Sequence, residues 1–357
     1  MKKITDKIEI TPGRFARNRI VMPPMDTLMA SDGFATDFHI QHYGSRAYGG
    51  TGTIIVESTA VSPEGKIREK DLGLWKDAQI APLAKVVDIV HQGGAVVGVQ
   101  LNHAGAKAEL EIETIGVTNY FNYLNQTKLK MATKADLQRI ENDFIDAAKR
   151  AKKAGFDFVE LHAAHGYLLN ELYHPLLNEI DKNSELIVRS QMIISIAKRI
   201  AEEVQITVGI RLSVEDDIDE SPLKITDMKP LIEALNNFVS YFHISSGATI
   251  GIVDNAKLIK NAGTKLFRIT YANEIAKWTD KKLIVVGNFQ TRADIEIALK
   301  NDIDLVAIGR EQIFNPNITI NNLLSAQELD NNLYHWNNNI WWSPQNYKKL
   351  IEDLDKK

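Results

Sequence analysis

Two histidines and a tyrosine stand close together in the segment that runs from His162 through His165 to Tyr167. An apolar run, Phe158–His162, leads directly into it and predicts a β-strand. Two imidazoles at the end of one strand can donate two N–H bonds to a single oxygen, and so hold and polarise a carbonyl or nitro group. A phenol can serve as a general acid. The segment therefore predicts a site where His162 and His165 anchor a substrate oxygen and Tyr167 supplies a proton.

The paired histidines allow two other interpretations. Two imidazoles can bind zinc, but the sequence shows no evident third ligand beside them. Alternatively, both rings hydrogen bond to backbone carbonyls and serve only the fold. We favour the ligand-binding interpretation because polar side chains follow nearly every predicted strand, and this convergence carries more weight than any one residue.

Two strand ends near the C-terminus suit a phosphate group. Gly287 follows one apolar run, and Gly309 with Arg310 follows the next. Glycine lets backbone N–H groups approach a phosphate closely, and a guanidinium can bind it through two parallel hydrogen bonds. The pair Gly-Arg is common in turns, so its position after the last predicted strand is what supports the prediction.

Two polar side chains end other predicted strands. Arg211 ends the run Thr207–Leu212, where a buried guanidinium would stabilise negative charge on a bound ring; the alternative is an ion pair with an acid of Glu215–Glu220. Gln100 ends the run Val96–Leu101, and its amide both donates and accepts, which suits a ring edge with N–H and C=O groups. For Gln100 alone, a side chain at the strand end that only hydrogen bonds within the protein is an equally good interpretation.

The strands themselves form a regular series. Short runs rich in valine and isoleucine alternate with longer segments of helical periodicity. Runs that are apolar on both faces belong to parallel sheets covered by helices, and the alternation predicts right-handed βαβ units. The predicted strands are Ile20–Pro24, Thr53–Glu57, Val96–Leu101, Phe158–His162, Thr207–Leu212, Tyr241–Ser246, Leu283–Gly287 and Leu305–Gly309.

Eight repeats fit a closed barrel better than an open doubly wound sheet, and no strand is followed by a glycine-rich dinucleotide turn. We therefore expect an α/β fold, a single (β/α)8 TIM barrel with loop insertions and a C-terminal extension. In such barrels the loops after the strands build the active site. The predicted helices are Ala81–Gln92, Lys134–Ala154, Ile187–Val204, Met228–Asn237, Ile269–Trp278 and Arg292–Leu299.

The composition excludes several classes of site. The 357 residues contain no cysteine, which rules out disulfides, a thiolate nucleophile and cysteine-bound metal centres. A net charge of −4 gives no reason to expect nucleic acid. No run reaches the roughly 18 apolar residues of a membrane span, and the N-terminal segment lacks the apolar core of a secretory signal. We expect a cytoplasmic protein without nucleic-acid or membrane partners.

We expect residues 1–325 to form the barrel and residues 326–357 to form an extension. The extension contains Trp336, Trp341 and Trp342, which predict packing on the barrel or a contact within an oligomer. Beyond Glu215, the loop after the fifth strand carries four more acids, and a solvated loop is the favoured interpretation over a metal site. These acids are Asp216, Asp217, Asp219 and Glu220.

Most of the first 310 residues also resemble one known family. The resembling segments include NRIVMPPM, DFHIQHYGSRA, IIVESTAVSPEGKI, VQLNHAGAKAEL, FVELHAAHGYLLNELYHPLLN and LVAIGRE. HAAHGYL followed by a late IGRE is a specific combination. Together they resemble the old yellow enzyme family of FMN-dependent oxidoreductases, and in particular its thermophilic-like bacterial subgroup.

The resemblance implies a role for individual residues. FMN is implied as the cofactor, NADH or NADPH as the electron donor, and an activated alkene or quinone as the small-molecule acceptor. The alkene would take a hydride from the flavin and a proton from Tyr167, with His162 and His165 holding its oxygen. Dimers or tetramers are common in the family. The positions implied to bind the cofactor are Pro24, Met25, Asp26, Ser58, Gln100, Arg211, Gly287, Gly309 and Arg310.

The chain departs from the subgroup around the substrate mouth. Asp26 stands where the subgroup has a cysteine that tunes the flavin, and Leu28 stands where it has a tyrosine that contacts substrate. An ionised Asp26 would disfavour the reduced flavin, unless a raised pKa keeps it neutral. After Asn178 a shorter loop replaces the family's glycine-containing run, and only Arg189 keeps a similar position.

These observations predict an NAD(P)H-dependent FMN oxidoreductase of the ene-reductase type. The alternative is an FMN-binding protein with lost or altered ene-reductase activity, such as a redox sensor. A metal-dependent barrel enzyme that uses the histidine pair is a third interpretation. In the tail, Tyr347 and Lys349 correspond weakly to a tyrosine and an arginine of the family.

Overall fold

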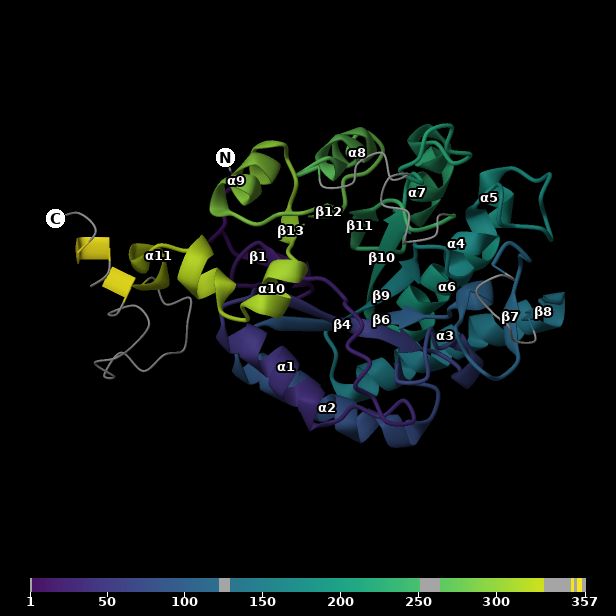
Figure 1. The fold of residues 1–357 in the computed structure, drawn as a ribbon, viewed down its shortest axis with the longest axis horizontal. Helices are drawn as coiled ribbons and strands as arrows, with labels where there is room; N and C mark the ends of the chain where they lie inside the picture. Colours follow the sequence, from purple (N-terminus) through teal and green to yellow (C-terminus); the bar gives the residue numbers. More distant parts are fainter. Residues whose placement is uncertain (1, 122–128, 251–263, 331–347, 350–351, 355–357) are drawn as a thin grey trace.

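The computed structural model describes residues 2–121, 129–250, 264–330, 348–349 and 352–354 (Figure 1). In these residues eight parallel strands close into a barrel, because β3 pairs with β13 on one side and with β4 on the other. The predicted TIM barrel is therefore confirmed. The barrel strands are β3 (Ile20–Met22), β4 (Thr53–Ala60), β6 (Val96–Asn102), β9 (Phe158–Ala163), β10 (Thr207–Ser213), β11 (Tyr241–Ser245), β12 (Lys282–Val286) and β13 (Leu305–Ala307).

Burial on both faces explains why these runs are continuously apolar. Every residue of β4, β6 and β9 is buried, since one face of each strand lines the barrel and the other meets the helices. A two-residue strand, β5 (Leu72–Gly73), pairs in parallel with the C-terminal end of β4. The register brings Gln100 beside Glu160 and Arg211 beside His162, so polar strand ends predicted separately are neighbours.

Helices surround the barrel, as Figure 1 shows. The predicted helix Lys134–Ala154 is confirmed as α3, while Ile187–Val204 is divided into α5, α6 and a wider turn at Ile200–Val204. The helices that follow the barrel strands are α1 (Asp37–Tyr48), α2 (Ile80–Gln92), α3 (Lys134–Ala154), α5 (Leu186–Arg189), α6 (Gln191–Arg199), α7 (Lys229–Leu235), α8 (Arg268–Ile275), α9 (Arg292–Lys300) and α10 (Arg310–Phe314).

Helix α1 was not among the predicted helices. Its buried residues include His39, Arg46 and Gly44 beside Tyr43, so its inner face lacks the apolar stripe that marks a helix in a sequence. The helix is held by polar contacts instead. His39 binds Glu57 at 2.9 Å, and Arg46 donates to the carbonyl of Gln312 at 2.9 Å. These contacts tie α1 to the middle of β4 and to α10.

A hairpin closes the amino-terminal end of the barrel. It consists of β1 (Ile8–Thr11) and β2 (Arg14–Ala16). Ile8 and Ile10 pack in one cluster with Phe158 and Tyr241, which begin two barrel strands. The hairpin seals the end opposite the loops that follow the strands.

The loops that follow the barrel strands contain the insertions that the sequence predicted. A parallel pair, β7 (Thr114–Gly116) and β8 (Leu129–Met131), lies after β6, and α4 (Leu168–Tyr173) lies after β9. No helix within the described residues is long and apolar enough to span a membrane.

The division at residue 325 stays a prediction. Beyond it the structure describes α11 (Ala326–Asp330) and a few residues near the C-terminus, including an exposed Lys349. Trp336, Trp341, Trp342 and Tyr347 lie outside the described residues, so the expected tail contact and oligomer are not tested.

Candidate active site

The three residues that the sequence singled out lie together after β9. The ring centroid of His162 is 5.1 Å from that of His165 and 4.9 Å from that of Tyr167, and both pairs are nearly perpendicular. His162 is buried, and its Nδ1 atom has no hydrogen-bond partner within the described residues. A buried polar atom without a partner carries a desolvation cost, so it is an atom that a ligand can engage.

The turn after β9 sets this arrangement. His165 and Gly166 both have positive φ values, 62° and 79°. The backbone N–H of His165 donates to the Ser213 hydroxyl, and its Nε2 atom is 2.9 Å from the Ser245 hydroxyl. Serines from the two following strands therefore hold the His165 backbone and ring in a conformation that costs energy for a residue with a side chain.

Burial and nearby cations keep the site in one protonation state. Burial, followed by the charge of Arg211, lowers the pKa of His162 and of His165 well below the usual value. Burial, followed by the charge of Asp26, raises the pKa of Tyr167. Both imidazoles are therefore neutral and the phenol keeps its proton near neutral pH.

A buried polar network lies beside the cluster. Glu160 accepts hydrogen bonds from Gln100 at 2.8 Å, His243 at 2.9 Å and Tyr241 at 3.1 Å. Although burial opposes its charge, His243 and Arg211 together lower the pKa of Glu160. The Nε atom of buried Arg211 has no hydrogen-bond partner in the described residues. Arg211 thus presents a cation with an open donor, while Glu160 orients Gln100.

Sequence reasoning missed Glu160 and His243. Glu160 precedes His162 by two positions in a strand, so both side chains point to the same face. His243 stands opposite Arg211 in the register of β11 against β10. Side chains alternate between the two faces of a strand, and this alternation could have identified both Glu160 and His243 from the sequence.

A cavity of about 200 Å³ lies at the ends of β12, β13 and β3. Its walls include Arg211, Gly287 and Gly309. A Cβ atom added to Gly309 would approach Met25 Sδ at 3.2 Å, so glycine keeps this wall open. Arg310 is exposed at the rim and donates to the Asn288 side chain at 3.0 Å. The predicted phosphate-binding residues are therefore brought together.

Arg268 is a third guanidinium in this cavity, beside Arg211 and Arg310, and no sequence pattern pointed to it. It donates to the Ser246 hydroxyl at 2.7 Å and to the Val286 carbonyl at 3.2 Å, and it lies 3.8 Å from Asp217. Arg268, rather than Arg211, is the arginine that meets an acid of the loop after β10. The alternative of an Arg211 ion pair within Glu215–Glu220 is therefore wrong.

The predicted acidic loop also needs correction. Asp219 and Glu220 are exposed as expected, but Asp216 and Asp217 are 4% and 2% exposed. The acidic composition of this loop alone predicted that all four carboxylates are exposed to solvent. The structure instead gives these two carboxylates buried donors, including His174 for Asp216 and Ser246 for Asp217.

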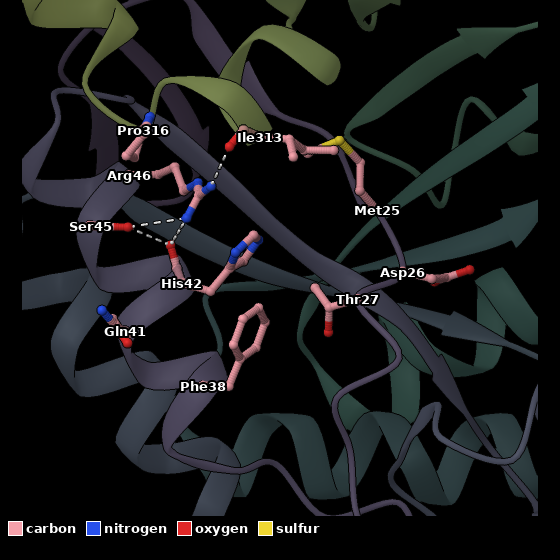
Figure 2. Close-up of a pocket in the computed structure, with 10 residues that line it drawn as sticks. All are labelled: Met25, Asp26, Thr27, Phe38, Gln41, His42, Ser45, Arg46, Ile313 and Pro316. Carbon is pink, nitrogen blue, oxygen red and sulfur yellow. Dashed lines mark hydrogen bonds between the residues drawn. The ribbon is translucent and has the colours of Figure 1, made fainter.

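A larger cavity of about 610 Å³ lies between α1 and α10, as Figure 2 shows. Met25 lines both cavities, and Asp26 lines the larger one. The carboxylate of Asp26 accepts the backbone N–H of Ser58, and enclosure by the protein, followed by Asp71 and Glu57, raises the pKa of Asp26 to about 8. The side chain remains open to water in the cavity, so this effect is fully developed only when a ligand displaces that water.

The remaining predicted positions lie around the same end of the barrel. Pro24 is buried in a wall of the smaller cavity, and Leu28 adopts a left-handed backbone with φ of 57°. Arg189 is buried at the end of α5 and donates to the carbonyl of Tyr173 at 3.1 Å, so it ties the shortened loop to α4. No group of three or more potential metal ligands is present among the described residues.

Comparisons with known proteins agree with this site. A family model described as the NADH:flavin oxidoreductase / NADH oxidase family matches residues 8–322. An NADPH dehydrogenase of Listeria welshimeri is 36% identical over 87% of this chain and 92% of its own length. An NADPH dehydrogenase of Geobacillus thermodenitrificans is also 36% identical, over 86% and 89%.

Solved structures support the fold. Morphinone reductase superposes with a TM-score of 0.74 at 24% identity over 88% of both chains. An old yellow enzyme homologue from Zymomonas mobilis gives a TM-score of 0.72 at 23% identity, over 88% of this chain and 91% of its own. The chain therefore belongs to the NADH:flavin oxidoreductase family, the old yellow enzyme family, whose members are FMN enzymes that take electrons from NADH or NADPH.

Proposed function

We propose that this protein uses NADH or NADPH to reduce electron-poor alkenes such as enones and quinones, with Tyr167 as the proton donor. The observation that carries the proposal is that the ring centroids of His165 and Tyr167 both lie within 5.1 Å of that of His162, beside the buried cation Arg211. Two neutral imidazoles can donate to one carbonyl oxygen, and a protonated phenol can deliver the proton.

The residues present fit FMN. The cavity with Gly287, Gly309 and Arg310 suits its phosphate, and the open Nε donor of Arg211 suits an electron-rich ring edge. Gln100 donates an amide N–H to Glu160, and its carbonyl oxygen could accept from an N–H group of the flavin ring. When bound, FMN supplies the two-electron chemistry between the nicotinamide and the acceptor.

The protein's own groups then have separate tasks. His162 and His165 bind and polarise the acceptor's oxygen, because their lowered pKa values keep them neutral donors. Tyr167 holds the proton, and its raised pKa makes it release that proton only to a strongly basic carbon centre. Arg211 offsets negative charge that develops on the ring next to it.

The test is a double variant, His162→Ala with His165→Ala, titrated with 4-nitrophenol while the flavin spectrum is recorded. Loss of two charge-assisted donors should weaken binding of the phenolate by about 100-fold or more. His91→Ala, a histidine that binds Asp157 on the barrel exterior, is the matched control and should leave affinity unchanged. Unchanged phenolate affinity in the double variant would overturn the assigned roles.

A second candidate is an FMN-binding protein that has lost ene-reductase turnover. Asp26 favours it, because a carboxylate at the larger cavity would disfavour a reduced, negatively charged ring whenever it ionises. Rapid steady-state reduction of 2-cyclohexenone by the purified protein would exclude this candidate.

A further inference from the structure

The loop after β10 contains a buried pair of acids, Asp216 and Asp217, that the proposed reaction does not use. Their exposed fractions are 4% and 2%. Asp217 has φ of 57°, a left-handed conformation that costs energy outside glycine. Two adjacent buried carboxylates in a strained turn require compensating contacts.

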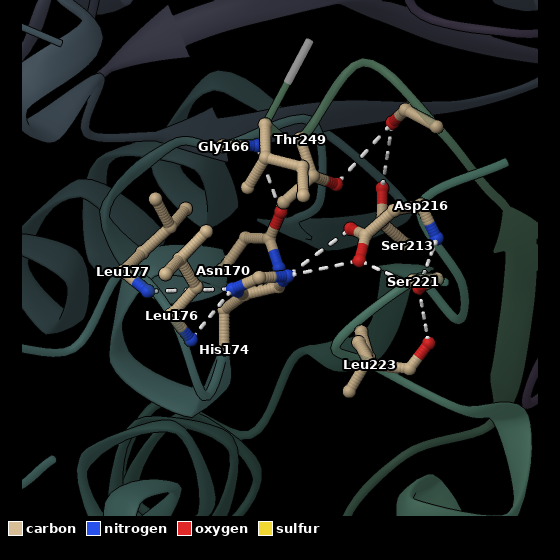
Figure 3. Close-up of polar contacts among 12 residues, drawn as sticks. Gly166, Asn170, His174, Leu176, Leu177, Ser213, Asp216, Ser221, Leu223 and Thr249 are labelled. Carbon is tan, nitrogen blue, oxygen red and sulfur yellow. Dashed lines mark hydrogen bonds and ion pairs between the residues drawn. The ribbon is translucent and has the colours of Figure 1, made fainter. Parts of the chain in front are cut away.

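Asp216 reaches toward α4, as Figure 3 shows. Its two oxygens lie 3.1 and 3.2 Å from Nε2 of His174, the residue that immediately follows α4, and Ser221 donates to it at 2.7 Å. The backbone N–H groups of Leu176 and Leu177 donate to Nδ1 of His174. Since Nδ1 accepts, Nε2 carries the hydrogen and donates to Asp216, so the imidazole is neutral and held on both sides.

Helix α4 connects this contact to the proton donor. Tyr167 is the residue immediately before α4, and His174 immediately follows it. At the start of the helix, Asn170 accepts the backbone N–H of Gly166 at 2.7 Å. A six-residue helix held at both ends moves as a unit, so the contact at His174 also constrains the backbone of Tyr167.

Asp217 reaches the opposite way, toward the smaller cavity. It accepts from the Ser246 hydroxyl at 2.6 Å and from the Tyr271 hydroxyl at 3.1 Å, and it lies 3.8 Å from Arg268. Arg268 also donates to the Ser246 hydroxyl and lines that cavity. Asp217 and Ser246 therefore determine where the guanidinium of Arg268 stands.

We propose that Asp216 and Asp217 are positioning residues that couple the phosphate cavity to the proton donor. Asp217 places Arg268 for contact with the phosphate of the flavin cofactor, and Asp216 holds α4 and thereby Tyr167. The proposal rests on the proposed function, because it assumes that the smaller cavity binds the FMN phosphate. Because Asp216 and Asp217 are adjacent in one loop, a change at one carboxylate should also alter the contacts of the other.

The Arg268 half is tested by comparing FMN with riboflavin, which lacks the phosphate. Arg268→Gln and Asp217→Asn should weaken FMN binding to the apoprotein, measured by flavin fluorescence, by about 10- to 100-fold and leave riboflavin binding unchanged. Arg199→Gln removes the last residue of α6, an arginine paired with Glu141 of α3 and with Glu203, and is the matched control. Equal losses for both flavins, or no loss for either, would overturn this half.

The Asp216 half is tested in the FMN-loaded enzyme. Asp216→Ala and His174→Ala should slow enone reduction at least about tenfold, while reduction by NADPH and 4-nitrophenol binding stay unchanged, because only the proton donor is displaced. Asp216→Asn keeps an acceptor for His174 and should restore most of the rate. Failure of Asn to rescue, or an equal loss in both half-reactions, would contradict a positioning role.

Coupling is tested by the double variant Asp216→Ala/Asp217→Asn. With FMN bound, its effect on the rate of enone-dependent flavin reoxidation should differ from the sum of the single effects, since the two side chains share a backbone turn. Additive effects would overturn the coupling and leave two independent contacts. Wild-type protein that binds neither flavin would instead refute the proposed function, which separates the two failures.

Discussion

At the scale of single residues, Tyr167 has the most specific predicted task. Its raised pKa keeps the phenol protonated, and its ring lies 4.9 Å from that of His162. Tyr167→Phe removes the proton and keeps the ring. Enone-dependent reoxidation of the flavin should slow by about 100-fold or more, whereas reduction by NADPH should be unchanged.

Stopped-flow absorbance measures the two half-reactions separately. Tyr48→Phe changes an exposed tyrosine of α1 and serves as the control. A variant in which both half-reactions slow equally would assign Tyr167 to binding and not to proton transfer.

Asp26 predicts a pH dependence of stability. Enclosure and the charges of Asp71 and Glu57 raise its pKa from 3.8 to about 8. When a bound ligand displaces the water around Asp26, the folded protein keeps a proton that the unfolded chain releases, so Asp26 costs stability increasingly as pH rises through this interval. In Asp26→Asn the melting temperature should exceed that of the wild type by more at about pH 8 than at about pH 5.

Differential scanning fluorimetry of the holoenzyme at both pH values provides the check, with the exposed Asp219→Asn as control. A difference in melting temperature that does not change with pH would show that Asp26 ionises normally.

The sequence indicated the candidate site residues at strand ends, but not those whose position depends on contacts between distant segments. His162, Gln100 and Arg211 could be predicted because a strand's side-chain period and the barrel rule place them together. Arg268 and the burial of Asp216 could not, since both depend on contacts between loops that are distant in sequence. No local pattern records such contacts.

At the scale of elements, capping explains which helices were predictable. Helix α3 begins after Thr133, whose hydroxyl accepts the N–H of Asp136, and it ends before Gly155 with φ of 92°. Both signals and an amphipathic stripe lie within the sequence, so the predicted bounds are confirmed. Helix α1 was missed because its inner face is polar and its partners, Glu57 and Gln312, lie in other elements.

The same capping contact can be tested directly. Thr133→Ala should lower the free energy of unfolding by about 1 kcal/mol, since an orphan helix N–H loses its acceptor. Thr291→Ala removes the equivalent cap of α9 and should have a similar effect. Urea titration measures both, with the exposed Thr226→Ala as control; a loss as large in the control would contradict the capping account.

At the scale of the whole molecule, a hairpin stabilises one end of the barrel and the candidate active site lies at the opposite end. Ile10 is 3% exposed in the hairpin that seals the amino-terminal end, together with Phe158 and Tyr241. Ile10→Ala should cost about 2–4 kcal/mol of unfolding free energy because it leaves a cavity. FMN affinity and NADPH-dependent reduction at the opposite end should be unchanged.

Urea unfolding and flavin fluorescence measured on the same preparation separate the two effects. Ile297→Ala, at a 44% exposed position of α9, is the control. Loss of FMN affinity in Ile10→Ala would show that the two ends are energetically linked.

The proposed function requires that neutral His162 and His165, protonated Tyr167 and Arg211 form a working flavin site. The most direct test is an anaerobic titration of the purified protein with NADH and with NADPH, followed by 2-cyclohexenone, while the visible spectrum is recorded. We predict a flavin spectrum that bleaches with a nicotinamide donor and recovers on addition of the enone. A flavin that does not bleach, or a colourless protein that FMN cannot reconstitute, would contradict the account.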